Sequence, residues 1–160
     1  MHKGSLVGRA LATVVTIVTI GAGAPLAAQR LSAVEAGAGG ALTVARHTLA
    51  AVEVGAAYRP GGQSRLALAL GAGSEDGAAA ARAQLTAQFL VTPNARRGTG
   101  VYGGIGVAVA GRRRTPGRGY LALLLGLEAA PGRRGGWYAE LGLAGGARVA
   151  AGWRSRWFRR

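Results

Sequence analysis

The 160-residue chain contains no cysteine, one methionine, and only six acidic residues against 20 Lys and Arg. The absence of cysteine excludes a disulfide scaffold, a thiol nucleophile and cysteine-based zinc sites. Aromatic residues make up only 6% of the sequence, whereas hydrophobic residues make up 49% and 29 residues are glycine. This apolar content is greater than that of disordered segments. The composition therefore predicts one folded domain with a net charge of +14.

The first 29 residues show the order of features that is typical of a secretory signal peptide. Two basic residues lie within the first nine, residues 10–20 are uncharged and apolar, and small residues precede Gln29. The apolar stretch is shorter than the roughly 20 residues that a membrane-spanning helix needs. We expect cleavage close to Gln29, which divides the chain into a signal peptide at 1–29 and an exported domain at 30–160.

From residue 32 onward, the sequence divides into short segments separated by clusters of Gly, Pro, Asn and Arg. The eight expected strands are 32–44, 49–58, 65–71, 82–91, 100–110, 120–129, 137–144 and 147–157. Glycine supplies positive φ angles and proline a fixed φ, so the separators have the composition of turns. Short strands at such regular spacing predict an all-β barrel or sandwich.

Within these segments, large aliphatic residues alternate with small or polar ones, as in strands that have two different faces. The large face includes Leu66, Leu68, Leu70, Leu85, Ile105, Val107, Leu121, Leu123, Leu125, Leu141 and Leu143. A soluble sandwich would carry Lys, Thr, Ser and Glu on the other face, which here is mostly Gly and Ala. The pattern favours an eight-stranded antiparallel up-and-down transmembrane barrel, with aliphatic residues facing lipid.

Four isolated glutamates fall on the small-residue side of their strands, which is the lumen side of such a barrel. We expect a polar network there, made of Glu35, Glu53, Arg82, Glu128, Glu140 and Arg148, with the hydroxyls of Tyr102, Tyr120 and Tyr138 as further partners. A carboxylate in a narrow lumen loses water, and only ion pairing or hydrogen bonding offsets that cost.

Most of the large aromatic residues share the aliphatic side of their strands. If the strands run alternately up and down, one rim collects Tyr58, Phe89, Trp137, Trp153 and Trp157. Indole and phenol rings prefer the boundary between membrane and water, so we interpret these five residues as an aromatic girdle.

Taken together, residues 32–158 resemble the small outer-membrane β-barrels of OmpA-like and OmpX-like proteins. The last segment, which ends in Trp157-Phe158, is similar to the C-terminal insertion signal of that family, although Arg159 and Arg160 follow it here. The resemblance implies an integral outer-membrane protein with a structural or interaction role and no catalysis. Bulk permeation is not expected, because eight strands enclose an interior that only just holds side chains.

Arginines gather in one predicted turn and are candidates for contact with lipid phosphates. They are Arg112, Arg113, Arg114 and Arg118. Guanidinium groups bind phosphate in a bidentate manner, so outer-membrane lipid, including lipopolysaccharide, is the expected partner; a solvated turn is the alternative interpretation. Export and the lack of interleaved aromatics argue against nucleic acid. We expect no cofactor and no metal, and the oligomeric state stays open.

Two other classes of protein remain as alternatives. One is an exported soluble β-barrel or sandwich that binds a small apolar ligand. The other is a membrane-bound lipid-modifying enzyme, which would need a Ser/His pair with an orienting carboxylate. His47 is the one histidine after the predicted signal peptide, and it lies in an expected loop with no serine at its level. Catalysis is therefore not predicted.

Overall fold

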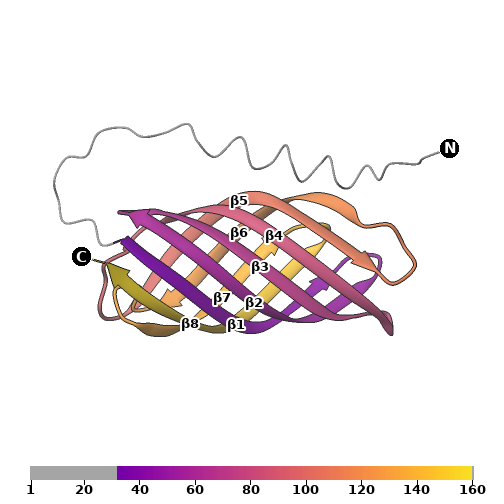
Figure 1. Ribbon diagram of the computed structural model, residues 1–160, viewed down its shortest axis with the longest axis horizontal. Coiled ribbons are helices and arrows are strands. Elements are labelled where there is room, and N and C mark those ends of the chain that lie inside the picture. Colours follow the sequence, from indigo (N-terminus) through magenta and orange to yellow (C-terminus); the bar gives the residue numbers. More distant parts are fainter. Residues whose placement is uncertain (1–31, 160) are drawn as a thin grey trace.

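The computed structural model describes residues 32–159, which form a closed barrel of eight antiparallel strands (Figure 1). The strands are β1 (Ser32–Val44), β2 (Thr48–Gly61), β3 (Ser64–Glu75), β4 (Ala78–Leu90), β5 (Thr99–Arg112), β6 (Arg118–Ala129), β7 (Gly135–Leu143) and β8 (Ala147–Arg159). Each strand pairs with the next along the chain, and β8 pairs with β1 to close the sheet. The predicted eight-stranded up-and-down barrel is confirmed, whereas the predicted signal peptide at 1–29 lies outside the described residues.

Within residues 32–159, no helix is long and apolar enough to cross a membrane.

The hairpin of β3 and β4 is longer than the sequence predicts. Residues 72–77 were expected to form a separator, but strand pairing continues up to Glu75 and Ala78. The turn is the dipeptide Asp76-Gly77, with φ angles of 48° and 82°. Positive φ at both central residues is the geometry of a tight type I′ hairpin turn. Residues 78–81 are all alanine, so no alternation in side-chain size marked them as part of a strand.

The two faces of the barrel wall differ sharply in exposure. On β6, Leu121 is 76% exposed and Leu123 is 51% exposed, while Ala122 between them is fully buried. Of the expected outward aliphatic residues, only Leu66 and Leu85 are half-buried, and the others are exposed. The outside of the wall is therefore apolar, and the inside is the packed side.

A few large apolar residues point inward, against the general pattern. Leu90 and Leu124 pack with Tyr102 in a small apolar cluster inside the barrel. Leu124 follows Leu123 directly in β6, so both faces of this strand carry a leucine at that level. Burial in the interior, rather than side-chain size, distinguishes the two.

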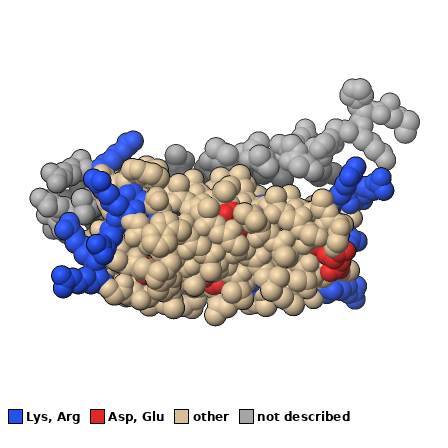
Figure 2. All heavy atoms as spheres, turned by 90° about the horizontal axis from the view of Figure 1, so that it is seen from below, with Lys and Arg blue, Asp and Glu red and all other residues tan. Residues whose placement is uncertain are grey.

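The barrel has two ends with different connections. The terminal end carries Ser32 and Arg159, the tight β2–β3 turn and the loops 91–98 and 130–134, whereas the far end carries four connections of two to five residues. Figure 2 shows Lys and Arg gathered at both ends, with few charges on the wall between them. Charge at the surface is thus confined to two bands separated by an apolar one.

Close approach of the strands requires an inward glycine on β5. A Cβ atom placed on Gly106 would lie 1.9 Å from the Leu85 carbonyl oxygen of the neighbouring strand β4. Strong coiling of strands is needed to close a barrel of only eight strands, and glycines at such points permit it. Gly103 lies on the outward side of the same strand. A Cβ atom placed on it would lie 3.7 Å from its nearest neighbour, the Leu124 carbonyl oxygen.

We expect Gly106→Ala to lower the free energy of unfolding by about 1–3 kcal/mol, because the added methyl group overpacks against backbone that must move. Gly103→Ala on the same strand is the matched control and should change it by no more than about 1 kcal/mol. Urea unfolding of the refolded protein in detergent, followed by tryptophan fluorescence, measures both. Equal effects of the two variants would contradict the role assigned to Gly106.

Candidate functional site

The interior of the barrel contains an unusual number of buried charged side chains. They are Glu35, Glu53, Glu128, Glu140, Arg59, Arg65, Arg82, Arg148, Arg154 and Arg156. All four expected glutamates lie inside, together with Arg82 and Arg148. The other four arginines were not among the predicted lumen residues, although each falls on the small-residue side of its strand. The alternation of side chains along the strand could have identified them. Arg154 and Arg156, for example, alternate with the outward Trp153 and Trp157.

Glu128 on β6 is the most heavily shared carboxylate. Its Oε2 atom accepts hydrogen bonds from Arg65 at 2.9 Å and Arg154 at 2.9 Å. Arg156 donates to the same atom at 2.8 Å. Glu128 is only 1% exposed, so three guanidinium groups from β3 and β8 converge on it across the lumen. Charge-assisted hydrogen bonds of this kind are stronger than neutral ones.

Glu35 on β1 completes this group, which we call the terminal cluster because it lies toward the terminal end. Arg59 donates to Glu35 Oε1 at 2.7 Å, and Arg65 donates to Oε2 at 3.2 Å. The Nε atom of Arg154 lies 3.7 Å from Glu35 Oε2. Two carboxylates therefore serve four arginines in the terminal cluster, made of Glu35, Glu128, Arg59, Arg65, Arg154 and Arg156.

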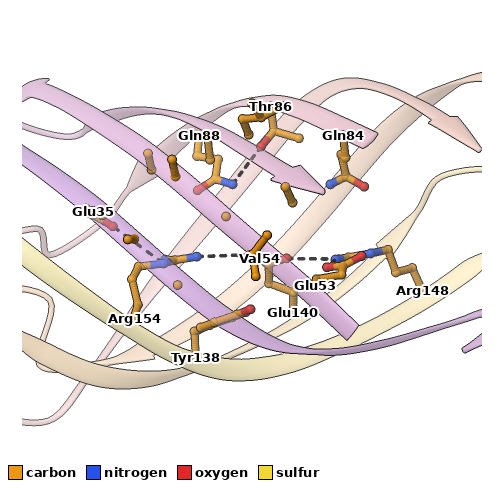
Figure 3. A pocket seen from close by; sticks show the side chains of 18 residues that line it. Glu35, Glu53, Val54, Gln84, Thr86, Gln88, Tyr138, Glu140, Arg148 and Arg154 are labelled. Atoms are coloured by element: carbon orange, nitrogen blue, oxygen red, sulfur yellow. Dashed lines mark hydrogen bonds and ion pairs between the residues drawn. The ribbon is translucent and has the colours of Figure 1, made fainter. Parts of the chain in front are cut away.

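A line of alternating charges continues from the terminal cluster along the barrel. Arg154 lies 3.6 Å from Glu140, and Arg148 donates to the other oxygen of Glu140 at 3.1 Å. Arg148 also forms an ion pair with Glu53. Figure 3 shows Glu35, Arg154 and Arg148 in one row, with these glutamates between and beside them. Because the row links β1, β2, β7 and β8, it braces the seam at which the barrel closes.

Aromatic rings fill the space beside these charges. Tyr102, Gly126 and Glu140 occupy one row of three neighbouring strands, and the Tyr102 hydroxyl donates to Glu140 at 2.8 Å. A Cβ on Gly126 would lie 2.2 Å from the Tyr102 ring, so the glycine makes room for the tyrosine to cross it. The Arg65 guanidinium stacks 4.4 Å from the centre of that ring, within the range of a cation–π interaction.

Tyr138 supports the same network from β7, and Tyr120 does not reach it. The Arg154 guanidinium lies 4.6 Å from the centre of the Tyr138 ring. Tyr120 is half-buried, lines the cavity at the far end, and packs its ring against Gly145. The structure therefore brings two of the three expected tyrosines to the interior charges.

Little free space remains between the interior side chains. A cavity of about 50 Å³ lies beside the line of charges and is bordered by Gln84, Thr86 and Gln88 on β4 (Figure 3). At about 10–15 Å³ for each water molecule, this volume accommodates a few waters with polar partners. At this level the interior is thus largely filled by polar and charged side chains.

His47 contacts a carboxylate at the far end. Its Nδ1 atom is hydrogen-bonded to Asp76, and the Thr48 amide donates to Asp76 at 3.2 Å. The bonds from His47 and from the Thr48 amide lower the pKa of the Asp76 carboxyl below its usual value. The ionised Asp76 therefore ties the β1–β2 turn to the β3–β4 turn. Among residues 32–159, no group of three or more His, Cys, Asp or Glu side chains could hold a metal ion.

The proposed girdle residues all have exposed side chains. Tyr58, Phe89, Trp137, Trp153 and Trp157 are on the outer face. Tyr58, Phe89, Trp137 and Trp157 lie in the parts of their strands nearer the terminal end. Trp153 is the central residue of β8 and pairs directly with Trp137.

The four turn arginines divide into two pairs. Arg113 and Arg114 are exposed in the loop between β5 and β6. Arg112, which is half-buried, and Arg118, which is exposed, both line a cavity at the far-end mouth of the barrel. The sequence placed all four arginines in one turn and did not distinguish those that line the cavity from those that do not.

Closed β-topology, an apolar outer wall and charged side chains inside define the fold of a small outer-membrane β-barrel. No family model and no curated protein sequence matches the chain. Solved structures with this fold include the N-terminal β-barrel domain of Pseudomonas aeruginosa OprF, with a TM-score of 0.60 and 20% identity, covering 81% of this chain and 100% of that one.

Two further outer-membrane proteins share the fold. The Pseudomonas aeruginosa protein OprG has a TM-score of 0.60 and 9% identity, covering 80% of this chain and 97% of that one. Ail of Yersinia pestis, in complex with the heparin analogue sucrose octasulfate, has a TM-score of 0.51 and 12% identity, covering 81% of this chain and 100% of that one. At sequence identities of 9–20%, this structural similarity establishes the fold alone.

We expect Glu128→Gln to lower the free energy of unfolding by about 3–5 kcal/mol, because it leaves three buried guanidinium groups without their shared carboxylate. Glu75→Gln is the matched control, since Glu75 forms no ion pair among residues 32–159, and it should change stability by less than about 1 kcal/mol. Urea unfolding measures both variants. A small effect at Glu128 would show that the terminal cluster contributes little to stability.

Proposed function

We propose that the chain is an integral outer-membrane protein with a structural or interaction role and no catalytic one. The observation that carries this proposal is the inverted polarity of the barrel. Ten charged side chains are buried inside, while Leu, Val, Ile, Trp and Phe side chains cover the outside. Soluble monomers rarely expose apolar patches larger than a few hundred Å², whereas lipid solvates such a surface.

The alternative of a soluble barrel that carries an apolar ligand has less support. Such a carrier needs an interior cavity with apolar walls, commonly of several hundred Å³. The cavity in the middle of the barrel is about 50 Å³ and is bordered by charged and polar side chains, including Glu53, Glu140 and Arg148, whereas the larger cavity at the far end is lined by four arginines. An apolar molecule would have to displace ion pairs to enter the cavity in the middle.

The filled interior supports a structural or interaction role. The ion pairs across the lumen leave no open path for bulk permeation, and an eight-stranded barrel is too narrow to provide one beside its side chains. Asp76 binds His47 through Nδ1, as the acid of a hydrolytic triad does, but among residues 32–159 no serine is hydrogen-bonded to this histidine. The chain is therefore better suited to contacts at its two ends than to chemistry within it.

Lipid is the expected partner of the outer surface. The exposed Arg113 and Arg114 suit contact with phosphate groups of outer-membrane lipid, including lipopolysaccharide. Tyr58, Phe89, Trp137 and Trp157, nearer the terminal end, suit the membrane interface at the other rim. The complex of Ail with a sulfated saccharide is compatible with recognition of anionic sugars by barrels of this fold.

Membrane integration can be tested by fractionating cells that express the full chain with an epitope tag. We expect the protein to stay in the membrane pellet after alkaline carbonate washing and to follow the outer-membrane band on a density gradient. A soluble exported protein processed in the same sample serves as the control and should be released. Release of the barrel together with this control would overturn the proposal.

Arginine substitutions on the outer face of β6 test for lipid contact by their dependence on depth. Leu123→Arg, near the middle of the strand, should cost about 2–4 kcal/mol of folding free energy in vesicles, and Leu127→Arg, nearer the terminal end, should cost less. Each is compared with the alanine variant at its own position, which removes the effect of losing leucine. Equal costs at the two depths would argue against a membrane-spanning wall.

A further inference from the structure

A basic cavity opens at the far end of the barrel, above the ion pairs of the interior. Its volume is about 360 Å³, which is within the range of sites for small ligands. Four arginines line it, namely Arg46, Arg82, Arg112 and Arg118, together with the hydroxyl-bearing residues Thr43, Thr115 and Tyr120. We call this space the mouth cavity.

Arg82 is the one arginine of the mouth cavity that is deeply buried, with 5% of its surface exposed. Its guanidinium donates to Gln84 Oε1 at 2.8 Å and to the Ala144 carbonyl oxygen at 3.0 Å. Both acceptors are neutral. Among the described residues no carboxylate lies within ion-pair distance of Arg82, and its Nε–H has no hydrogen-bond partner. A buried charge in this state is costly unless an anion approaches it.

Strand register brings two further arginines to the same side of the wall. Arg112 on β5 is the direct neighbour of Ala80, two residues before Arg82 on β4. Arg118 on β6 is the direct neighbour of Ala110 on β5. Arg82, Arg112 and Arg118 thus come from three adjacent strands and share the inward parity of Ala108 and Ala122.

Acidic side chains near the mouth cavity do not neutralise this charge. Glu75 is the one carboxylate that lines the cavity, against four arginines, and it forms no ion pair among residues 32–159. Asp76 does not line the cavity; it is held by His47 and the Thr48 amide, with Arg112 as a more distant positive charge. The cavity therefore keeps an excess of positive charge.

Packed side chains border the mouth cavity on its inner side. Ala144 lines it and packs with the buried Ala108 and Ala122 in a small apolar cluster, and Arg148, the strand neighbour of the lining residue Thr43, is paired with Glu53. A molecule entering from the far end would stop at Arg82. The space has the form of a blind binding pocket rather than the entrance of a channel.

We propose that the mouth cavity binds a phosphate monoester group, with Arg82 at its base and Arg112 and Arg118 at its sides. A phosphate dianion offers several oxygens to guanidinium groups that bind in a bidentate manner. The hydroxyls of Thr43, Thr115 and Tyr120 add neutral donors and acceptors for the polar molecule that carries the phosphate, such as a sugar. That carrier is either a dissolved compound or the phosphorylated sugar headgroup of a lipid in the same leaflet.

The proposal is tested by calorimetric titration of the refolded full chain in an amine oxide detergent, whose headgroup carries no phosphate. The probes are inorganic phosphate and glucose 6-phosphate, at constant ionic strength set with chloride. We expect saturable binding, and we expect Arg82→Gln to weaken it at least about tenfold, as loss of a charge-assisted hydrogen bond does. Arg97→Gln is the matched control, because Arg97 is exposed in the 91–98 loop at the opposite end of the barrel, and it should leave the affinity within about twofold.

Arg118→Gln guards against a folding defect of the first variant and should also weaken binding while leaving the unfolding curve in place. Absence of saturable binding, or equal weakening by Arg82→Gln and Arg97→Gln, would overturn the proposal. The source of the phosphate is distinguished in bilayer discs with and without lipopolysaccharide. If the lipopolysaccharide headgroup is the natural ligand, discs that contain lipopolysaccharide do not bind glucose 6-phosphate. If a dissolved compound is the natural ligand, the affinity for glucose 6-phosphate is the same in both kinds of disc. The site needs only the closed barrel, so failure of membrane fractionation would leave this test unaffected.

Discussion

The constraint on which the rest of this structure depends is that an eight-stranded barrel must fill its own interior with side chains. In this chain, charged side chains fill much of it, and each buried charge requires a partner close at hand. Every interior glutamate has at least one arginine within ion-pair distance. Because the charges occupy the inside, the aliphatic and aromatic residues of the same strands must face outward, and this apolar wall in turn requires a lipid environment. The polarity of the wall is thus a consequence of how the interior is filled.

Much of the fold could be predicted from the sequence, because the two-residue period of a strand is directly readable. Leucine alternating with alanine or glycine identified both the strands and their faces. The prediction was wrong where this contrast is absent, as in the four alanines at 78–81, which have one size on both faces. Leu124 was hidden for a related reason, since leucines on both sides of it give the segment no contrast in size.

The sequence can predict which charged residues face the interior, but it cannot predict which of them form ion pairs with one another. Parity alone assigns a glutamate or arginine to the lumen, and the same reasoning applied to Arg59, Arg65, Arg154 and Arg156 would have included them. Which groups meet depends on strand closure, since Glu128 on β6 binds arginines from β3 and β8. Those strands are not neighbours in the sheet, so their contacts arise only when the barrel curves its inner faces toward one another.

The two ends of the barrel handle their surplus of positive charge differently. At the terminal end, Arg59 and Arg156 have carboxylate partners, and they also donate to the carbonyl oxygens of Pro93 and Arg133 at 3.0 Å and 3.4 Å. The longer loops of that end thus fold back and supply acceptors for guanidinium groups that two glutamates cannot fully satisfy. The far end has shorter connections, and Arg82 there reaches neutral oxygens alone. Water or an anion that enters through the open mouth can therefore compensate its charge, and this asymmetry makes the far end the more suitable place for recognition.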